Sequence, residues 1–425
     1  MLDTLNVTEL ANGIKIVTLE QPHAESAQIA IHVRVGSRNE TEAQNGASHF
    51  IEHMLFKGTA KRSAKAISQA IEGQGGSINA FTDKDNTCYY VKVPYDRAFF
   101  ALNVLADLFY NSTFDEKELN RERQVIAEEI YMYDDQPDSL ALENLNGQLW
   151  SGHPLGRPIL GTLQSLSGLT RDALLHYRTT QYAPCRTVFS FAGKIQHDAC
   201  VKAVEKLAGH LTNPPLLREP ETFSRAIPQE PLTLTKRDIQ QTQLAFGWRT
   251  PGLMESKALA VASVLSCALG ESMMSRLFQS IRERKGLCYS ITSGRTLAVD
   301  CGALLVTAGC ESRKAGQCTR AILAEVRKLM EKPMSAAELR RTRDYLCGRF
   351  RLRMDGAPIG WAAGRILFGV SADPEAVLEG IRAVTAEEVR AFATEILTPE
   401  RLSLAIVAPK KDATSETAWL KLRNY

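Results

Sequence analysis

Residues 28–34 read Gln-Ile-Ala-Ile-His-Val-Arg, an apolar and β-branched run that predicts a strand. A similar run, Gln-Leu-Ala-Phe-Gly-Trp-Arg, returns at residues 243–249, which is 215 positions later (243 less 28). The same offset relates the helix and strand pattern of residues 170–192 to that of residues 385–407. Two separated matches at one offset indicate a duplicated domain of roughly 200 residues, with a coincidence of common patterns as the alternative.

Residues 213–231 separate the two copies. They are rich in proline and charge and show little apolar periodicity, so we expect a linker there. The linker divides the chain into an N-terminal domain, residues 1–212, and a homologous C-terminal domain, residues 232–425. Domains of this length can each bury a core of their own.

Strand patterns precede helix patterns within each copy. Strands are predicted at residues 14–19, 29–35 and 89–93, and Asp96 is expected to cap the helix that follows. Elements that occur in such blocks favour an α+β fold class over a doubly wound parallel sheet. We therefore predict two homologous domains, each a mainly antiparallel sheet covered by helices.

Composition excludes some partners. A net charge of +3, with 23% charged residues, leaves no large field of one sign, so neither nucleic acid nor an anionic membrane surface is indicated as a partner. Nine cysteines without a C-x-x-C pair favour a reducing compartment. The first residues lack a signal-like pattern, and no apolar run reaches about 18 residues. We expect a cytoplasmic protein, although a processed mature form would look the same.

A candidate metal motif lies at residues 49–53, His-Phe-Ile-Glu-His. On a helix, His49 and His53 are one turn apart and Glu52 shares their face, while the neighbouring residues are apolar. Two imidazoles at this spacing can bind one zinc ion, and the carboxylate can reach a zinc-bound water. The pattern is the inverzincin signature, but alone it also fits two satisfied helix histidines.

A second helix, predicted over residues 115–133, offers a third ligand. Its apolar stripe is interrupted by Glu122 and Glu129, and a buried carboxylate needs a cationic partner such as a metal with its histidines. Glu128 is a neighbouring competitor but lies about 100° round the helix on the polar face. We choose Glu129, with salt-bridged glutamates on a solvated helix as the alternative. The other positions of the stripe are Leu119, Ile126 and Tyr133.

These motifs resemble those of the pitrilysin and insulysin family, especially its two-domain members akin to processing peptidase β-subunits. The likeness covers nearly the whole chain. It is carried by residues 49–53, by Phe-Lys-Gly-Thr at 56–59, by Gly-Gly-Ser-Ile-Asn-Ala at 75–80, and by the spacing of Glu122 and Glu129. The resemblance implies one Zn²⁺ per chain. The resemblance further implies that the metal ligands are His49, His53 and Glu129, that the catalytic base is Glu52, and that Glu122 supports the site.

The resemblance also implies how substrate is held. The backbone at Asn79 and Ala80 would pair with a peptide as an added strand. Residues 282–289, Arg-Glu-Arg-Lys-Gly-Leu-Cys-Tyr, match a second family motif, in which Arg282 and Tyr289 reach the active site from a partner half across a closed clamshell chamber. Without the family, Arg282 is a charge at a helix end and Tyr289 a strand aromatic.

The expected function is a zinc-dependent endopeptidase that hydrolyses short or unfolded peptides inside a dimeric chamber, as a homodimer or with a homologous subunit. At offset 215 the ligand set is replaced by Val264, Cys267 and Ala268, so one metal site per chain follows. The alternative is a catalytically inactive structural or regulatory partner subunit of the same family. An inactive partner with a glycine-rich loop ranks lower, because no long glycine run occurs between residues 250 and 289.

Overall fold

The computed structural model describes residues 5–215, 219–224, 229–356, 358–412 and 414–423, so part of the predicted linker lies outside the described residues. The chain forms two compact units that are discontinuous in sequence. The first unit comprises Met1–Ile130, Arg157–Glu221 and Met354–Pro374, and the second unit comprises Tyr131–Gly156, Thr222–Arg353 and Glu375–Tyr425. The predicted domain limits at residues 212 and 232 stay predictions.

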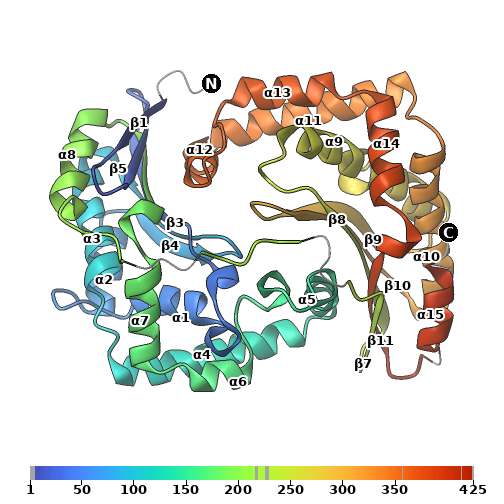
Figure 1. Ribbon diagram of the computed structural model, residues 1–425, viewed down its shortest axis with the longest axis horizontal. Helices are drawn as coiled ribbons and strands as arrows, with labels where there is room; N and C mark the ends of the chain where they lie inside the picture. The colour runs from blue at the N-terminus through green and yellow to red at the C-terminus, as the bar shows by residue number, and fades with distance from the viewer. Residues whose placement is uncertain (1–4, 216–218, 225–228, 357, 413, 424–425) are drawn as a thin grey trace. The chain divides into compact units, whose positions relative to one another are not determined.

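The first unit contains a six-stranded sheet in the order β1-β2-β6-β3-β5-β4 (Figure 1). All neighbouring strands are antiparallel except β2 and β6. The predicted strands at 14–19, 29–35 and 89–93 correspond to β2, β3 and β5. The strands are β1 (Leu5–Glu9), β2 (Lys15–Glu20), β3 (Ser26–Val33), β4 (Ser77–Thr82), β5 (Thr87–Pro94) and β6 (Thr187–Gly193).

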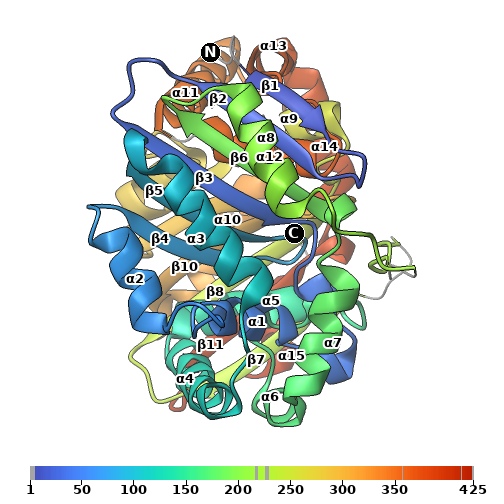
Figure 2. The ribbon, with the colours of Figure 1, turned by 90° about the vertical axis from the view of Figure 1, so that its left-hand side faces the viewer.

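Helices cover this sheet. Figure 2 looks onto one face, where α8, α3 and α2 cross in front of the strands, and the main core of the unit lies between them. On the opposite face α12 packs against β2, β3 and β6 through Ile359 and Ala363. The helices are α1 (Ala47–Leu55), α2 (Ala64–Glu72), α3 (Ala98–Asn111), α4 (Glu116–Asp134), α6 (Leu163–Gly168), α7 (Arg171–Gln181), α8 (His197–Ala208) and α12 (Pro358–Leu367).

The second unit contains a five-stranded sheet in the order β7-β11-β8-β10-β9. Helices α10 and α14 lie on one face with the larger core, and α5 lies on the other (Figure 1). The strands are β7 (Leu232–Arg237), β8 (Gln241–Thr250), β9 (Ser290–Leu297), β10 (Gly302–Glu311) and β11 (Ser403–Pro409). The helices are α5 (Pro137–Leu149), α9 (Ser256–Ser266), α10 (Ser312–Glu331), α11 (Ala336–Gly356), α13 (Pro374–Ala383), α14 (Ala386–Ile396) and α15 (Glu416–Leu422).

The strand register confirms the duplication. Ala30 of β3 lies opposite Ser190 of β6, and Ala245 of β8 lies opposite Ala405 of β11. Both members of the second pair are 215 positions after their counterparts. Helices α7 and α14 obey the same offset at both of their ends. The α+β fold class with two similar sheets is therefore confirmed.

One helix of each copy packs in the other unit. Helix α5 follows α4 in the chain but contacts β8 and β11, and α12 follows α11 but contacts β6. Gly247 of β8 makes room for α5, because a Cβ there would lie 2.8 Å from Leu149 and 3.1 Å from Leu145. The two units therefore do not follow a single division of the sequence.

Two local predictions have different outcomes. Asp96 does not cap α3, because it lies in a short 3-10 turn, Tyr95–Arg97, and the helix begins after it without a side-chain cap. The helix predicted over residues 115–133 is α4, and its stripe ends before Tyr133, which is exposed. No helix in the described ranges is long and apolar enough to cross a membrane.

Candidate metal centre

Helix α1 is fixed at its start by a buried carboxylate. Glu40 is fully buried, and its two oxygens accept hydrogen bonds from the backbone N–H groups of Gly46 and Ser48, both 2.8 Å long. Burial raises the pKa of Glu40 to about 7, although these N–H donors favour its charged form. Gly46 has a φ of +94°, and a Cβ there would meet the Leu160 carbonyl oxygen at 2.7 Å. A glycine is therefore needed where the chain enters α1.

The apolar face of α1 holds the helix in the core. Phe50, Ile51, Met54 and Leu55 are completely buried. Burying side chains of this size stabilises a fold by about 1.5–3 kcal/mol each. The helix therefore cannot rotate to expose its polar stripe, which faces α4.

The structure brings the three predicted ligands together. Glu129 Oε2 lies 3.7 Å from His49 Nε2 and 3.8 Å from His53 Nε2. One ligand atom from each residue lies within 4.8 Å of the other two, the only such group of three among the described histidines, cysteines and acidic residues. Glu128, the competing residue, is exposed.

This geometry fits a zinc ion. Four ligands with bonds of about 2.1 Å in a tetrahedron lie about 3.4 Å apart, slightly closer than the distances found here. Burial, together with the nearby His53, lowers the pKa of His49 to about 3, so its imidazole is neutral at physiological pH. The neutral imidazole is the form that binds metal. Nδ1 of His49 is buried without a hydrogen-bond partner in the described structure.

Glu122 links the site to a lysine. Its carboxylate is buried and lies 3.0 Å from His53 Nδ1 and 2.6 Å from Lys57 Nζ. A carboxylate on the second ring nitrogen orients a ligating histidine and raises its basicity. The sequence predicted that the Glu122 carboxylate would need a cationic partner. Lys57 is such a partner, although the sequence analysis did not link these two residues.

Glu52 shares the polar stripe of α1 and lies half-buried. Its carboxylate accepts a hydrogen bond from the Thr82 hydroxyl at the end of β4. Burial raises the pKa of Glu52, and the Thr82 hydrogen bond opposes this shift. A raised pKa suits a group that takes a proton and later returns it. Thr82 ends the strand that the sequence singled out, but its hydroxyl was not predicted to reach Glu52.

Asn79 and Ala80 lie on β4, which is the last strand of its sheet. They pair with Tyr90 and Tyr89 of β5, and no described strand pairs with the other side of β4. The Ala80 N–H donates to the Asn79 side chain at 2.8 Å. This edge therefore offers unpaired backbone groups, one of them held by a side chain that an added strand would displace.

Arg282 and Tyr289 lie together in the second unit. Arg282 belongs to a π-helical segment, Phe278–Arg284, and Tyr289 directly precedes β9. The Arg282 guanidinium carbon is 5.8 Å from the centre of the Tyr289 ring and 4.6 Å from that of Phe278. Tyr289 is 79% exposed, so its hydroxyl is available to a ligand.

Among the described residues, the matching place in the second unit holds no set of metal ligands. A hollow of about 20 Å³, room for a single water, is lined by Cys267, Ala268 and Thr342 among other residues. Cys267 and Ala268 are the residues at offset 215 from Glu52 and His53. The polar stripe of α1 is thus replaced by small or apolar side chains.

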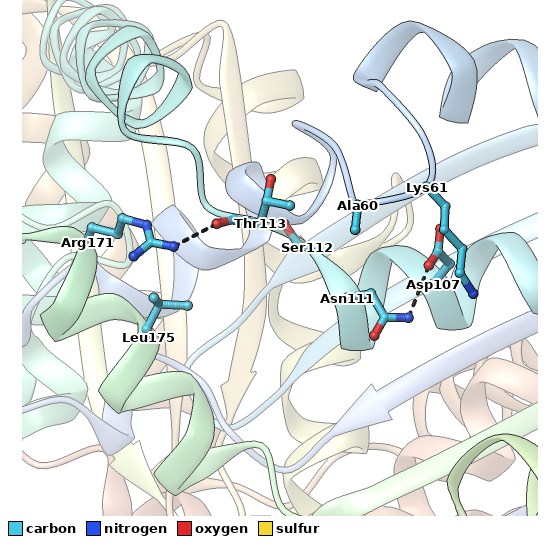
Figure 3. Close-up of a pocket in the computed structure, with 8 residues that line it drawn as sticks. All are labelled: Ala60, Lys61, Asp107, Asn111, Ser112, Thr113, Arg171 and Leu175. Atoms are coloured by element: carbon cyan, nitrogen blue, oxygen red, sulfur yellow. Dashed lines mark hydrogen bonds between the residues drawn. The ribbon is translucent and has the colours of Figure 1, made fainter.

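A larger hollow of about 560 Å³ lies elsewhere on the first unit (Figure 3). Two of its charged side chains already have partners, and the third, Lys61, is exposed. Arg171 donates to the carbonyl oxygens of Phe114 and Thr113, while Asp107 accepts from Arg62 and Asn111. No metal-ligating group of three lies here among the described residues, so this hollow is a weaker candidate than the α1–α4 site.

Comparisons with known proteins identify a family. The model of the insulinase family, peptidase family M16, matches residues 15–163, and the model of the M16 inactive domain matches residues 168–346. An uncharacterized zinc protease of Bacillus subtilis, YmxG, is 35% identical, covering 95% of this chain and 98% of its own length. An uncharacterized zinc protease of Mycobacterium leprae is 36% identical over 95% of this chain and 91% of its own.

Solved structures share the fold. A protease from Helicobacter pylori has a TM-score of 0.87 at 20% identity, covering 96% of this chain and all of its own. A Pseudomonas fluorescens protein described as a peptidase M16 inactive domain also has a TM-score of 0.87, at 18% identity, over 97% of this chain and all of its own.

Proposed function

Because this chain belongs to the insulinase family, peptidase family M16, we propose that it is a zinc-dependent endopeptidase. The observation that carries the proposal is the convergence of His49, His53 and Glu129 on one point, with Glu52 on the same helix face. Relatives named zinc proteases support the metal and the reaction class. The metal ligands would be the two Nε2 atoms and a Glu129 oxygen.

The residues around this point divide the chemistry. Zinc, when bound, supplies a Lewis acid for the scissile carbonyl and lowers the pKa of a water to about 7. Glu52 accepts the proton of that water and then donates it to the departing amine. Thr82 orients the Glu52 carboxylate, and Glu122 orients the His53 ring.

We propose that substrate is an extended peptide bound along β4. The free edge of β4 supports backbone pairing at Asn79 and Ala80, which is largely indifferent to side-chain sequence. Arg282 and Tyr289 would bind the substrate carbonyl and the developing oxyanion. Following the family resemblance, they would come from the partner of a dimer that encloses short or unfolded peptides.

The decisive test is metal analysis combined with chelator-sensitive cleavage. Purified protein should hold one zinc per chain and cleave unstructured peptides, while a folded protein substrate stays intact. Protein that binds no metal and cleaves nothing would favour an inactive partner subunit instead. Cleavage that persists after complete chelation would also contradict the proposal.

The shared site has its own test. Chains with Glu52→Gln are mixed with chains carrying Arg282→Ala, and mixed dimers are isolated. If Arg282 acts in trans, one site of each mixed dimer is intact and part of the activity returns. Verified mixed dimers with no recovered activity would contradict a site built from two chains.

A further inference from the structure

The two histidines of α1 are held in different ways. His53 has a carboxylate on its second ring nitrogen, because Glu122 Oε2 lies 3.0 Å from its Nδ1. Nδ1 of His49 is buried and has no hydrogen-bond partner among the described residues. A ligating histidine normally has such a partner to orient its ring. The direction of the His49 ring therefore depends on how the backbone of α1 is placed.

Glu40 fixes this backbone. His49 is the third residue of α1, and Ser48 directly before it donates its N–H to Glu40 Oε1 at 2.8 Å. Glu40 Oε2 accepts the N–H of Gly46, also at 2.8 Å, and the side-chain amide of Asn45 at 3.1 Å. The Glu40 side chain is fully buried, so water does not compete for these bonds. Both carboxylate oxygens thus hold the turn of α1 that carries His49.

The titratable groups around Glu40 leave its carboxylate without a paired cation. Arg157 donates to the Glu40 backbone carbonyl instead, at 2.8 Å. Arg38 of the preceding turn is paired with Asp85 at 3.2 Å. Tyr177 of α7, which packs against α1, stays neutral because burial raises its pKa. Within the described ranges, no basic side chain forms an ion pair with the Glu40 carboxylate.

The charged form of Glu40 is therefore supported chiefly by hydrogen-bond donors. Three donors suit a charged carboxylate, which only accepts hydrogen bonds, and the N-terminus of a helix favours negative charge. Burial raises the pKa of Glu40 to about 7 against these donors. Both forms of the side chain are consequently present near neutral pH, whereas His49 stays neutral in this range.

We propose that Glu40, in its charged form, is a positioning residue for zinc binding, and that it releases the first turn of α1 when it takes up a proton. His49 would then be free to move away from Glu129, whose Oε2 lies 3.7 Å from His49 Nε2. The buried negative charge also attracts a divalent cation, so its loss weakens zinc binding in the same direction. This inference rests on the proposed function, while the hold of Glu40 on α1 does not.

The test compares Glu40→Gln with Glu42→Gln. Glutamine keeps the size of the side chain but removes the charge, and its amide brings N–H donors toward the N–H groups that Glu40 accepts. Glu42 is exposed and provides the same change of charge as a control. Zinc affinity is measured by competition with a chelating dye, after circular dichroism has shown that both proteins are folded. At pH 8, Glu40→Gln should bind zinc about 10- to 100-fold more weakly than Glu42→Gln, which should match wild type.

The pH dependence separates the role of the charge from a merely structural one. Protonation of histidines lowers zinc affinity in both variants, so the ratio of their affinities reports Glu40. This ratio should shrink by up to about tenfold between pH 8 and pH 6, because Glu40 of the control is then mostly protonated. Equal affinities at pH 8 would overturn the proposal. A ratio that stays large and constant from pH 8 to pH 6 would also overturn it, since the charge would then have no part in zinc binding.

A second measurement uses the metal-free wild-type protein and remains decisive should Glu40→Gln fail to fold. Hydrogen exchange of a peptide covering residues 45–50, corrected for the intrinsic effect of pH, should show a loss of protection between pH 8 and pH 6. Residues 89–93 of β5 are the reference and should keep their protection. Unchanged protection of residues 45–50 would overturn the release of α1. If no sample binds zinc, the proposed function fails, and the exchange measurement still tests the hold of Glu40 on α1.

Discussion

Helix α1 and its counterpart in the second unit occupy the same place in the repeat but differ in what they bury. Helix α1 carries His49 and His53 toward Glu129 of α4, and Glu52 toward Thr82 of β4. Its counterpart, the end of α9 with the π-helical segment Cys267–Glu271, carries Val264, Cys267 and Ala268. All three are buried. The fold therefore also forms when this stripe is small or apolar.

The facing helices differ in the same way. Asp115 before α4 and Ser335 before α11 both accept hydrogen bonds from the N–H groups of the first turn, which aligns the two helices. In this alignment Glu122 matches Thr342 and Glu129 matches Arg349. Burying imidazoles and carboxylates costs free energy unless they are compensated. The second unit has none of these groups at the matching positions, and this contrast favours the proposed role of the first unit's groups in binding a metal.

The largest effect on zinc binding and activity should come from replacing His53 with alanine, the residue at the matching position 268 of the second unit. His53→Ala removes one proposed ligand and the partner of Glu122, so bound zinc should fall from one per chain to background. Peptide hydrolysis should fall to the level of the chelated protein. The exposed His176 offers a control, since His176→Ala should leave both quantities unchanged. A zinc content of one per chain in His53→Ala, measured by mass spectrometry of the metal, would remove His53 from the ligand set.

Replacing the proposed base should separate chemistry from metal binding. Glu52→Gln retains the shape of the side chain and its contact with Thr82 but cannot accept a proton, so kcat should fall by about 10²- to 10⁴-fold. Zinc content should stay at one per chain. Cys267→Ala changes the matching residue of the second unit and should leave kcat unaltered. Full activity in Glu52→Gln protein would refute the assignment of the base.

Residue patterns identify the repeat and the histidine helix because both rest on local spacing. The offset of 215 residues also relates the strand registers of the two sheets. Glu122 and Glu129, which interrupt the apolar stripe of α4, face the histidines of α1 as the helical period predicts. The exchange of α5 and α12 between units has no such signal, because each helix has the pattern of its own copy. Gly247, a glycine within a strand, is the single hint, since it marks close approach by another element.

The supporting residues of the site were missed for a related reason. Glu40 lies nine positions before His49 and acts through backbone N–H groups of α1. Thr82 reaches Glu52 from a strand 30 positions away. Lys57 was noted as part of a motif but was not linked to Glu122. Such contacts depend on tertiary packing, and no spacing along the chain encodes them.

A smaller effect is expected at the support of His53. Glu122→Gln removes the charge that orients the His53 ring, so zinc affinity should weaken by about 10- to 100-fold while some activity remains at saturating metal. Glu128→Gln on the exposed face of α4 is the matched control and should not alter affinity. The measurement is zinc competition with a chelating dye. Equal zinc affinity in the two variants would show that Glu122 pairs with Lys57 but does not support zinc binding.

The smallest effect concerns a position where the copies differ away from the metal: His32 of β3 matches Gly247 of β8. Burial lowers the pKa of His32 to about 4, and its Nε2 lies 3.1 Å from the Ser190 hydroxyl. In the unfolded chain the histidine pKa is about 6.5, so below this pH the unfolded state binds a proton that the folded state, with its lowered pKa, does not. The free energy of unfolding is therefore highest above pH 6.5 and decreases as the pH falls toward 4. Between pH 6.5 and 5.5 the loss should be about 1 kcal/mol. Hydrogen exchange of the β3 amides measures it, His32→Gln should lack it, and His176→Gln should retain it. If the stability of β3 had the same pH dependence in wild type and His32→Gln, the pKa of His32 would not be lowered in the folded state. The two copies would then not differ in acid stability through this residue.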